Sequence, residues 1–137
     1  MTPSATRHVF VYGTLRKGEE RDINRLRPAP QSVGRAQVAG VMHHLGSYPG
    51  LVLGGTGVVH GEVYAVSPEL ERVLDEIEEV WPQQTGEYTK REVVVQLDTI
   101  PPRELLCVLY EISLERTRGR PVIAGGDWVL HRAGRQA

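Results

Sequence analysis

Short apolar runs, separated by glycine and proline, dominate the sequence and predict more strands than helices. β-Branched and aromatic residues fill positions 8–12, apolar and polar residues alternate over 58–66, and two further strands are expected at 88–97 and 105–112. Residues 33–45 follow this alternation less regularly, and we expect a further strand there. Since regular helices do not separate these strands, the pattern favours an α+β fold built on a curved antiparallel sheet or small barrel.

One amphipathic helix is predicted in the middle of the chain. Ser67 is a residue type that caps helix N-termini, and Pro68 suits the first helical position. A single apolar stripe follows at helical spacing and consists of Leu70, Val73, Leu74, Ile77 and Trp81. Pro82 is expected to end this helix. The sequence therefore predicts one main helix that packs against the sheet.

The rest of the chain gives weaker signals. Residues 19–26 are predicted to form a short helix, and the glycine-rich residues 46–57 a loop with a short strand at 51–53. A turn is expected at Gly125 and Gly126, just before a short apolar run at 128–130. None of these segments changes the expected fold class.

Length and charge limit the classes to which the protein can belong. At 137 residues the chain is long enough for one domain, which we place at residues 8–137 after a flexible leader at residues 1–7. Its 16 basic and 17 acidic residues give no electrostatic reason to expect nucleic acid or an anionic membrane as a partner. The sequence contains no signal-peptide core and no membrane-spanning stretch, so we expect a cytoplasmic protein. Its oligomeric state stays open.

The cysteine and histidine content argues against disulfides and metal sites. Cys107 is the single cysteine, which excludes an intramolecular disulfide, and its apolar neighbours favour a packed, reduced thiol. None of the five histidines has the partner spacing of a zinc site. We therefore expect no metal site.

The turn after the first predicted strand is a candidate binding element. Its glycines, Gly13 and Gly18, have the spacing of a nucleotide-binding P-loop, but Glu19 and Glu20 stand where that motif needs lysine and serine or threonine. Two carboxylates there would repel a polyphosphate, so we reject nucleotide binding. The backbone N–H groups of such a turn can instead hold a carboxylate or an oxyanion, although a plain connecting turn has the same spacing.

A carboxylate near the end of the predicted helix is the best candidate for acid–base chemistry. At ~100° per residue, Glu78 lies on the flank of the apolar stripe beside Leu74, whereas Glu79 lies on the solvent side. Partial burial would raise the pKa of Glu78 towards neutrality, as a general base or acid requires. The pattern alone favours the alternative, a solvated carboxylate paired with a lysine or arginine.

Several separated segments together resemble the γ-glutamylcyclotransferase-like (AIG2-like) family. Residues 11–18 (VYGTLRKG) resemble its Y-G-[ST]-L signature, and residues 61–64 (GEVY) its G-x-[VL]-[YF] strand. The L-D-x-x-E and Y-x-R-like blocks are matched by Leu74, Asp75 and Glu78, followed by Tyr88 and Arg91. Weaker similarities lie at residues 46–50 and 126–128. The order and approximate spacing agree over about residues 8 to 130.

This resemblance implies a compact barrel-like α+β fold with a small pocket and no cofactor. It also implies that a small γ-glutamyl substrate is cleaved by internal cyclisation, which releases 5-oxoproline and a free amine or amino acid. Glu78 matches the family's catalytic glutamate, and the resemblance assigns the γ-glutamyl group to the loop of Tyr12, Gly13, Thr14 and Leu15. Two further residues are counted with the substrate site: Tyr88, which begins the Y-x-R-like block, and Arg16, which would add charge complementarity unless it faces solvent.

Two departures from the family pattern leave a second hypothesis open. The family usually has glycine directly after the catalytic glutamate, where this chain has Glu79, and residues 80–87 form a longer segment before Tyr88. Both changes touch the rim of the expected pocket. The alternative is therefore a metabolite-binding or interaction domain of the same fold that lacks turnover.

Overall fold

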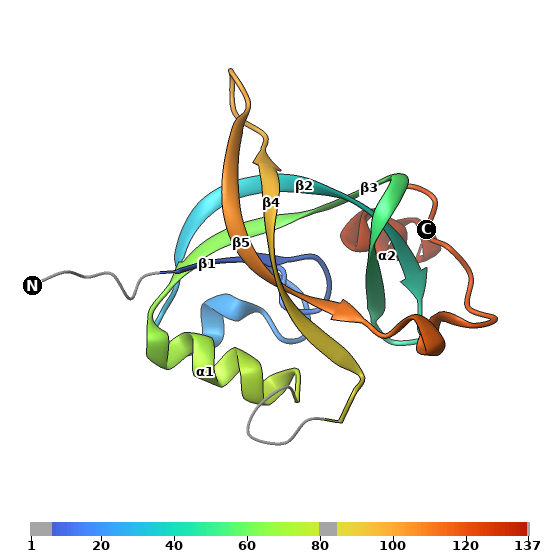
Figure 1. Ribbon diagram of the computed structural model, residues 1–137, viewed down its shortest axis with the longest axis horizontal. Helices are drawn as coiled ribbons and strands as arrows, with labels where there is room; N and C mark the ends of the chain where they lie inside the picture. The colour runs from blue at the N-terminus through green and yellow to red at the C-terminus, as the bar shows by residue number, and fades with distance from the viewer. Residues whose placement is uncertain (1–6, 80–84, 137) are drawn as a thin grey trace, which may run out of the picture.

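Five strands close into a barrel in the computed structural model, which describes residues 7–79 and 85–136 (Figure 1). The elements are β1 (Arg7–Val11), η1 (Ile23–Arg25), β2 (Gln31–His44), β3 (Pro49–Val66), α1 (Pro68–Ile77), β4 (Tyr88–Leu97), β5 (Arg103–Ile112), η2 (Leu114–Thr117) and α2 (Trp128–Gln136). Around the barrel the strands follow the order β1, β3, β2, β4, β5. The predicted α+β fold with a small barrel is thus confirmed. Within these residues, neither helix is long and apolar enough to cross a membrane.

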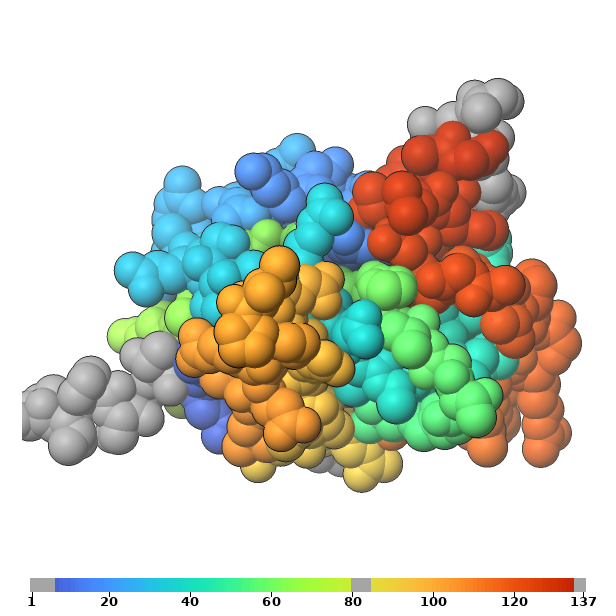
Figure 2. Space-filling model, turned by 90° about the horizontal axis from the view of Figure 1, so that it is seen from above, coloured from blue at the N-terminus to red at the C-terminus, as the bar shows by residue number. Residues whose placement is uncertain are grey.

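Two long hairpins and one short strand make up the barrel. β2 pairs with β3, and β4 with β5, both antiparallel, whereas β1 is antiparallel to β3 and parallel to β5. β2 and β4 pair only at Ala36 with Leu97 and Gln37 with Gln96. The tip of the β4–β5 hairpin stands at the opposite end of the molecule from α1 (Figure 1). Seen from above, that tip faces the viewer, and α2 lies at one edge (Figure 2).

The predicted loop at residues 46–57 is wrong over most of its length. Residues 49–53 pair with 40–44 and so extend β3 well beyond the short strand expected at 51–53. Gly50 and Gly57 lie where another part of the chain approaches closely, and Gly54 and Gly55 adopt a positive φ, so these glycines do not mark a loop. A Cβ at Gly50 would lie 2.8 Å from Cβ of Ile112. Residues 54–57 belong to β3 but have no partner in β2, opposite a register shift between Ala39 and Gly40, and residues 46–48 precede the strand.

β1 is buried on both faces, which explains its continuous apolar sequence. Phe10 points into the barrel, where it joins a core that includes Met42, Leu51 and Val59. Val9 and Val11 point outwards and pack in a second core with Leu70 and Leu74 of α1. The apolar stripe predicted for the helix therefore covers the outside of β1.

The main helix ends earlier than the sequence pattern predicts. α1 stops at Ile77, Glu78 caps it, and Glu79 adopts a left-handed backbone conformation with φ of 57°. A left-handed residue is a common way to end a helix, and it acts here before Pro82 could. Trp81 and Pro82 lie outside the described residues, as do residues 1–6 of the predicted leader. Arg7, the last residue of that leader, begins β1.

Two other local predictions need correction. Within residues 19–26 only the single turn η1 is helical, and the side chain of Asp22 caps it by accepting a hydrogen bond from the N–H of Asn24. The apolar run at 128–130 begins helix α2, which we did not expect because the run is too short to show helical periodicity.

Candidate active site

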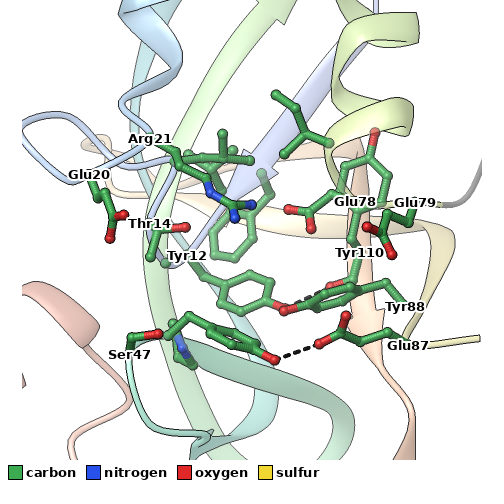
Figure 3. Close-up of a pocket in the computed structure, with 17 residues that line it drawn as sticks. Tyr12, Thr14, Glu20, Arg21, Ser47, Glu78, Glu79, Glu87, Tyr88 and Tyr110 are labelled. Atoms are coloured by element: carbon green, nitrogen blue, oxygen red, sulfur yellow. Dashed lines mark hydrogen bonds between the residues drawn. The ribbon is translucent and has the colours of Figure 1, made fainter. Parts of the chain in front are cut away.

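A cavity of about 220 Å³ opens where β1, α1 and β4 meet (Figure 3). The turn that follows β1 forms one wall, and the residues that end α1 form the wall facing it. Tyr88 at the start of β4 and residues 47–49, where β3 begins, also line it. The cavity thus draws together segments that lie far apart in the sequence.

Most residues assigned to the site from the sequence line this cavity. They are Tyr12, Gly13, Thr14, Leu15, Glu78 and Tyr88. Gly13 is required by close approach, because a Cβ there would lie 2.8 Å from Cγ of Pro49. Tyr12 does not offer a free hydroxyl to a ligand. Its hydroxyl donates a hydrogen bond of 2.7 Å to the carbonyl oxygen of Tyr110 and accepts one of 3.3 Å from the N–H of Leu51.

Arg16 is not part of the cavity wall. Its side chain is only 5% exposed, and its guanidinium pairs with Glu62 through Nε at 3.0 Å and with Asp127 through Nη1 at 2.9 Å. Neither alternative considered for Arg16, contact with substrate or exposure to solvent, describes this position. Arg16 instead ties the turn after β1 to β3 and to the residue that precedes α2.

The turn after β1 keeps several backbone N–H groups unused. The amide of Arg16 donates to the carbonyl oxygen of Gly13, and the amide of Ile23 donates to that of Leu15, so the turn is closed on itself. Among the described residues, no backbone hydrogen bond of a turn or loop uses the N–H groups of Gly13, Thr14 or Leu15. These three residues line the cavity, and their amides are available to an anionic group.

Glu78 brings a desolvated carboxyl group into the cavity. Burial is the main cause that raises its pKa to about 7, the charges of Glu87 and Glu79 raise it further, and Arg21 opposes the shift. No hydrogen bond or ion pair among the described residues engages its carboxylate. Figure 3 shows the carboxylate directed across the cavity towards the guanidinium of Arg21. Such a group can take up and return a proton near neutral pH.

Sequence patterns missed several residues of the cavity. Arg21 lies in a segment interpreted as a short helix, and no local pattern indicated that its side chain reaches the site. Glu87 accepts a hydrogen bond of 2.6 Å from the hydroxyl of Tyr48, across 39 residues of sequence. Glu20 and Tyr110 also line the cavity. Of these residues, only Glu20 had drawn attention in the sequence, as one of two carboxylates that argue against a nucleotide site.

Replacing Glu79 with glycine is expected to stabilise the protein by about 1 kcal/mol, because glycine adopts a positive φ without the strain that a Cβ causes. The change should also lower the pKa of Glu78, since the charge of Glu79 raises it. Glu79→Ala is the matched control, because it removes the charge and keeps the Cβ. Urea unfolding should separate the two variants, and carboxyl NMR titration should show the same lower pKa in both. Equal stability of the two variants would contradict the assignment of strain to Glu79.

Comparison with known proteins agrees with the fold and with the family resemblance. The model of the family described as γ-glutamyl cyclotransferase, AIG2-like, matches residues 9–130. A Vibrio cholerae protein provisionally named a γ-glutamylcyclotransferase is 35% identical over 88% of this chain and 93% of its own length. The Niallia circulans γ-L-glutamyl-butirosin B γ-glutamyl cyclotransferase is 41% identical, over 53% of this chain and 46% of that enzyme.

Solved structures share the same architecture. The crystal structure of a mouse AIG2-like protein aligns with a TM-score of 0.69 at 27% identity, over 85% of this chain and 84% of that one. The solution structure of YtfP from Escherichia coli aligns with a TM-score of 0.59 at 27% identity, over 91% and 98% of the two chains. The chain therefore belongs to the γ-glutamyl cyclotransferase, AIG2-like family.

Proposed function

We propose that this protein is a γ-glutamyl cyclotransferase that cleaves a γ-glutamyl amide by internal cyclisation, releasing 5-oxoproline and a free amine or amino acid. The observation that carries the proposal is the carboxyl group of Glu78, which enters the cavity without a protein partner among the described residues and has a pKa raised to about 7. Family membership supports the reaction class. The substrate's amine is left open.

The chemistry asks little of the protein beyond proton transfer and positioning. Glu78 takes a proton from the substrate's α-ammonium group, and the freed amine attacks the γ-carbonyl carbon. A C–N bond forms and closes the five-membered ring, and the C–N bond to the leaving amine then breaks. Glu78 returns the proton to the leaving nitrogen, and the second proton that the ring nitrogen must lose passes to the released amine, which becomes an ammonium, so no net proton, water or cofactor is consumed. Because nucleophile and electrophile belong to one molecule, holding the substrate in a folded conformation supplies much of the rate.

Negative charge that develops on the γ-carbonyl oxygen needs hydrogen-bond donors. The N–H groups of Gly13, Thr14 and Leu15 are suitable, since they line the cavity and no turn or loop hydrogen bond of the described residues consumes them. Donors fixed in this way stabilise an oxyanion without reorganisation. The rigid attachment of this turn through Arg16 supports the same role.

The case for binding without turnover rested on Glu79, which occupies the position of the family's glycine. Glu79 has a φ of 57°, the backbone conformation that glycine adopts readily. The substitution therefore keeps the helix end in the shape that directs Glu78 into the cavity. No observation in the described residues favours the binding domain over the enzyme.

The activity should depend on pH through Glu78. A general base acts only when deprotonated, so kcat/KM is expected to fall about tenfold per pH unit below an apparent pKa of about 7. In Glu79→Ala this acid limb should move to lower pH, because a charge that raises the pKa of Glu78 is lost. Initial rates between pH 5 and 9 test both statements. An acid limb near the ordinary pKa of a glutamate would contradict the role given to burial.

The reaction itself is tested by mass-spectrometric detection of 5-oxoproline after incubation with a panel of γ-glutamyl amides. The panel should contain γ-glutamyl amino acids, γ-glutamyl-lysine and γ-glutamyl derivatives of larger amines. We expect 5-oxoproline from at least one member, and the best substrate identifies the amine. Failure of every member would contradict the proposed function.

A further inference from the structure

Arg21 differs from every other charged residue of the cavity. The remaining charged side chains that line it are the carboxylates of Glu20, Glu78, Glu79 and Glu87. Among the described lining residues, Arg21 is thus the one basic side chain, and it lies across the cavity from Glu78 (Figure 3). A single guanidinium in an otherwise acidic cavity marks the place where an anionic group of a ligand can bind.

A hydrogen bond fixes the backbone of Arg21 to the turn that forms the cavity wall. Its N–H donates a hydrogen bond of 2.8 Å to the carbonyl oxygen of Thr14. The next residue, Asp22, accepts hydrogen bonds from the N–H groups of Gly18 and Asn24, which fixes the tight turn on either side of Arg21. The backbone of Arg21 is therefore held at a fixed position relative to the free amides of the turn.

The guanidinium of Arg21 is also unoccupied by other protein groups. Arg16 and Arg132 form ion pairs with carboxylates of the chain, whereas no ion pair or hydrogen bond among the described residues engages the guanidinium of Arg21. Its donors are thus available for a ligand. A guanidinium binds a carboxylate through two parallel N–H···O bonds, which fixes both its position and its orientation.

The γ-glutamyl group carries two opposite charges on one carbon atom, an ammonium and a carboxylate. When the ammonium lies against Glu78, the carboxylate attached to the same carbon must lie nearby. Arg21 faces Glu78 across the cavity and so offers the matching charge (Figure 3). This arrangement leaves the amides of Gly13, Thr14 and Leu15 to the γ-carbonyl oxygen.

We propose that Arg21 binds the α-carboxylate of the γ-glutamyl group and restricts the enzyme to substrates in which that carboxylate is free. γ-Glutamyl groups whose α-carboxyl is blocked, as an amide or within a peptide, are then poor substrates. This inference rests on the proposed function, and Arg21 acts in it as a specificity-determining residue.

The test compares two substrates in four enzymes. The substrates are the γ-anilide of L-glutamate and the same anilide with an α-carboxamide, which cyclise to 5-oxoproline and its amide respectively. The enzymes are the wild type, Arg21→Met, Arg21→Lys and Arg25→Met. Arg25 is the matched control, since it is an exposed arginine on η1 that does not line the cavity. Rates are compared well above the acid limb of each enzyme, because loss of Arg21 raises the pKa of Glu78.

The wild type is expected to prefer the carboxylate substrate by roughly 100-fold in kcat/KM, the size of effect that a charge-assisted pair supplies. Arg21→Met should lose most of this preference by slowing the carboxylate substrate alone. Arg21→Lys should keep part of the preference, and Arg25→Met all of it. Equal slowing of both substrates by Arg21→Met, with the preference unchanged, would overturn the proposal.

A binding measurement separates this inference from the proposed function. Two analogues in which a methylene replaces the scissile nitrogen, one with the α-carboxylate and one with the α-carboxamide, are titrated calorimetrically. Even without any turnover, Arg21→Met should weaken binding of the carboxylate analogue alone. If the wild type binds neither analogue, or binds both equally well, Arg21 does not recognise the α-carboxylate and the proposal is wrong. Turnover by the wild type with unchanged selectivity in Arg21→Met would overturn this inference and leave the proposed function standing.

Discussion

Replacing Glu78 with glutamine is expected to lower kcat by roughly 100- to 10,000-fold, the range that general acid–base groups contribute. Glutamine has nearly the same shape as glutamate, so it keeps the lining of the cavity, but it cannot accept the proton of the α-ammonium group. The matched control is Glu76→Gln, an exposed position of α1 that does not line the cavity and should retain full activity. Steady-state release of 5-oxoproline measures both variants.

The stability of Glu78→Gln shows whether a loss of activity comes from the missing proton transfer or from unfolding of the protein. Burial raises the pKa of Glu78 from 4.5 to about 7, so the native state binds this proton more tightly than the unfolded chain does. Wild-type stability should therefore decline as the pH rises from 4.5 to 7, and the glutamine variant should lack this decline. Thermal melts at pH 8 should find the variant at least as stable as the wild type. Wild-type activity in this well-folded variant would mean that another residue transfers the proton.

Replacing Arg16 with methionine is expected to destabilise the protein by about 3 kcal/mol. The substitution leaves two carboxylates without their cation, on Glu62 and Asp127, whose side chains are only 15% and 17% exposed. Losing one member of a buried ionic group costs more than the pair itself contributes, because the remaining charge stays desolvated. Urea unfolding at neutral pH measures the loss.

Arg91→Met is the matched control for this prediction. Arg91 pairs with Glu111 at 3.0 Å, but its side chain is 52% exposed, so the same chemical change should cost no more than about 1 kcal/mol. If the two arginine variants were equally stable, the role of Arg16 as the anchor of the turn would be wrong.

Local sequence patterns were sufficient for most strands and for the placement of Glu78. The strand expected at 88–97 has the observed bounds of β4, and the helical stripe placed Glu78 beside Leu74 on the flank of α1. They failed where a contact between distant segments determines the structure. Gly50, Gly57 and Gly61 of β3 lie where neighbouring chain approaches closely, and a pattern of side-chain types contains no record of that approach. The end of α1 is set by the positive φ of Glu79, which the apolar stripe of the helix does not indicate.

The motif segments converge in space in a way that their sequence spacing did not indicate. Arg16, Glu62 and Asp127 come from three segments that resemble the family, and they form one buried ionic group beneath the turn. The sequence left Arg16 open between substrate contact and exposure to solvent, because a partner 46 or 111 residues away cannot be inferred from local spacing. Arg21 was missed for the same reason, since its role depends on Glu78 across the cavity.

The most direct test of the central claim is the reaction in water enriched in oxygen-18, with the products analysed by mass spectrometry. Cyclisation uses the substrate's own amine, so we predict 5-oxoproline without added oxygen-18 from the wild type and almost none from Glu78→Gln. Release of glutamate that carries one oxygen-18 atom in its carboxylate would mean that water attacks the γ-carbonyl, and it would contradict the assignment of this protein as a cyclotransferase.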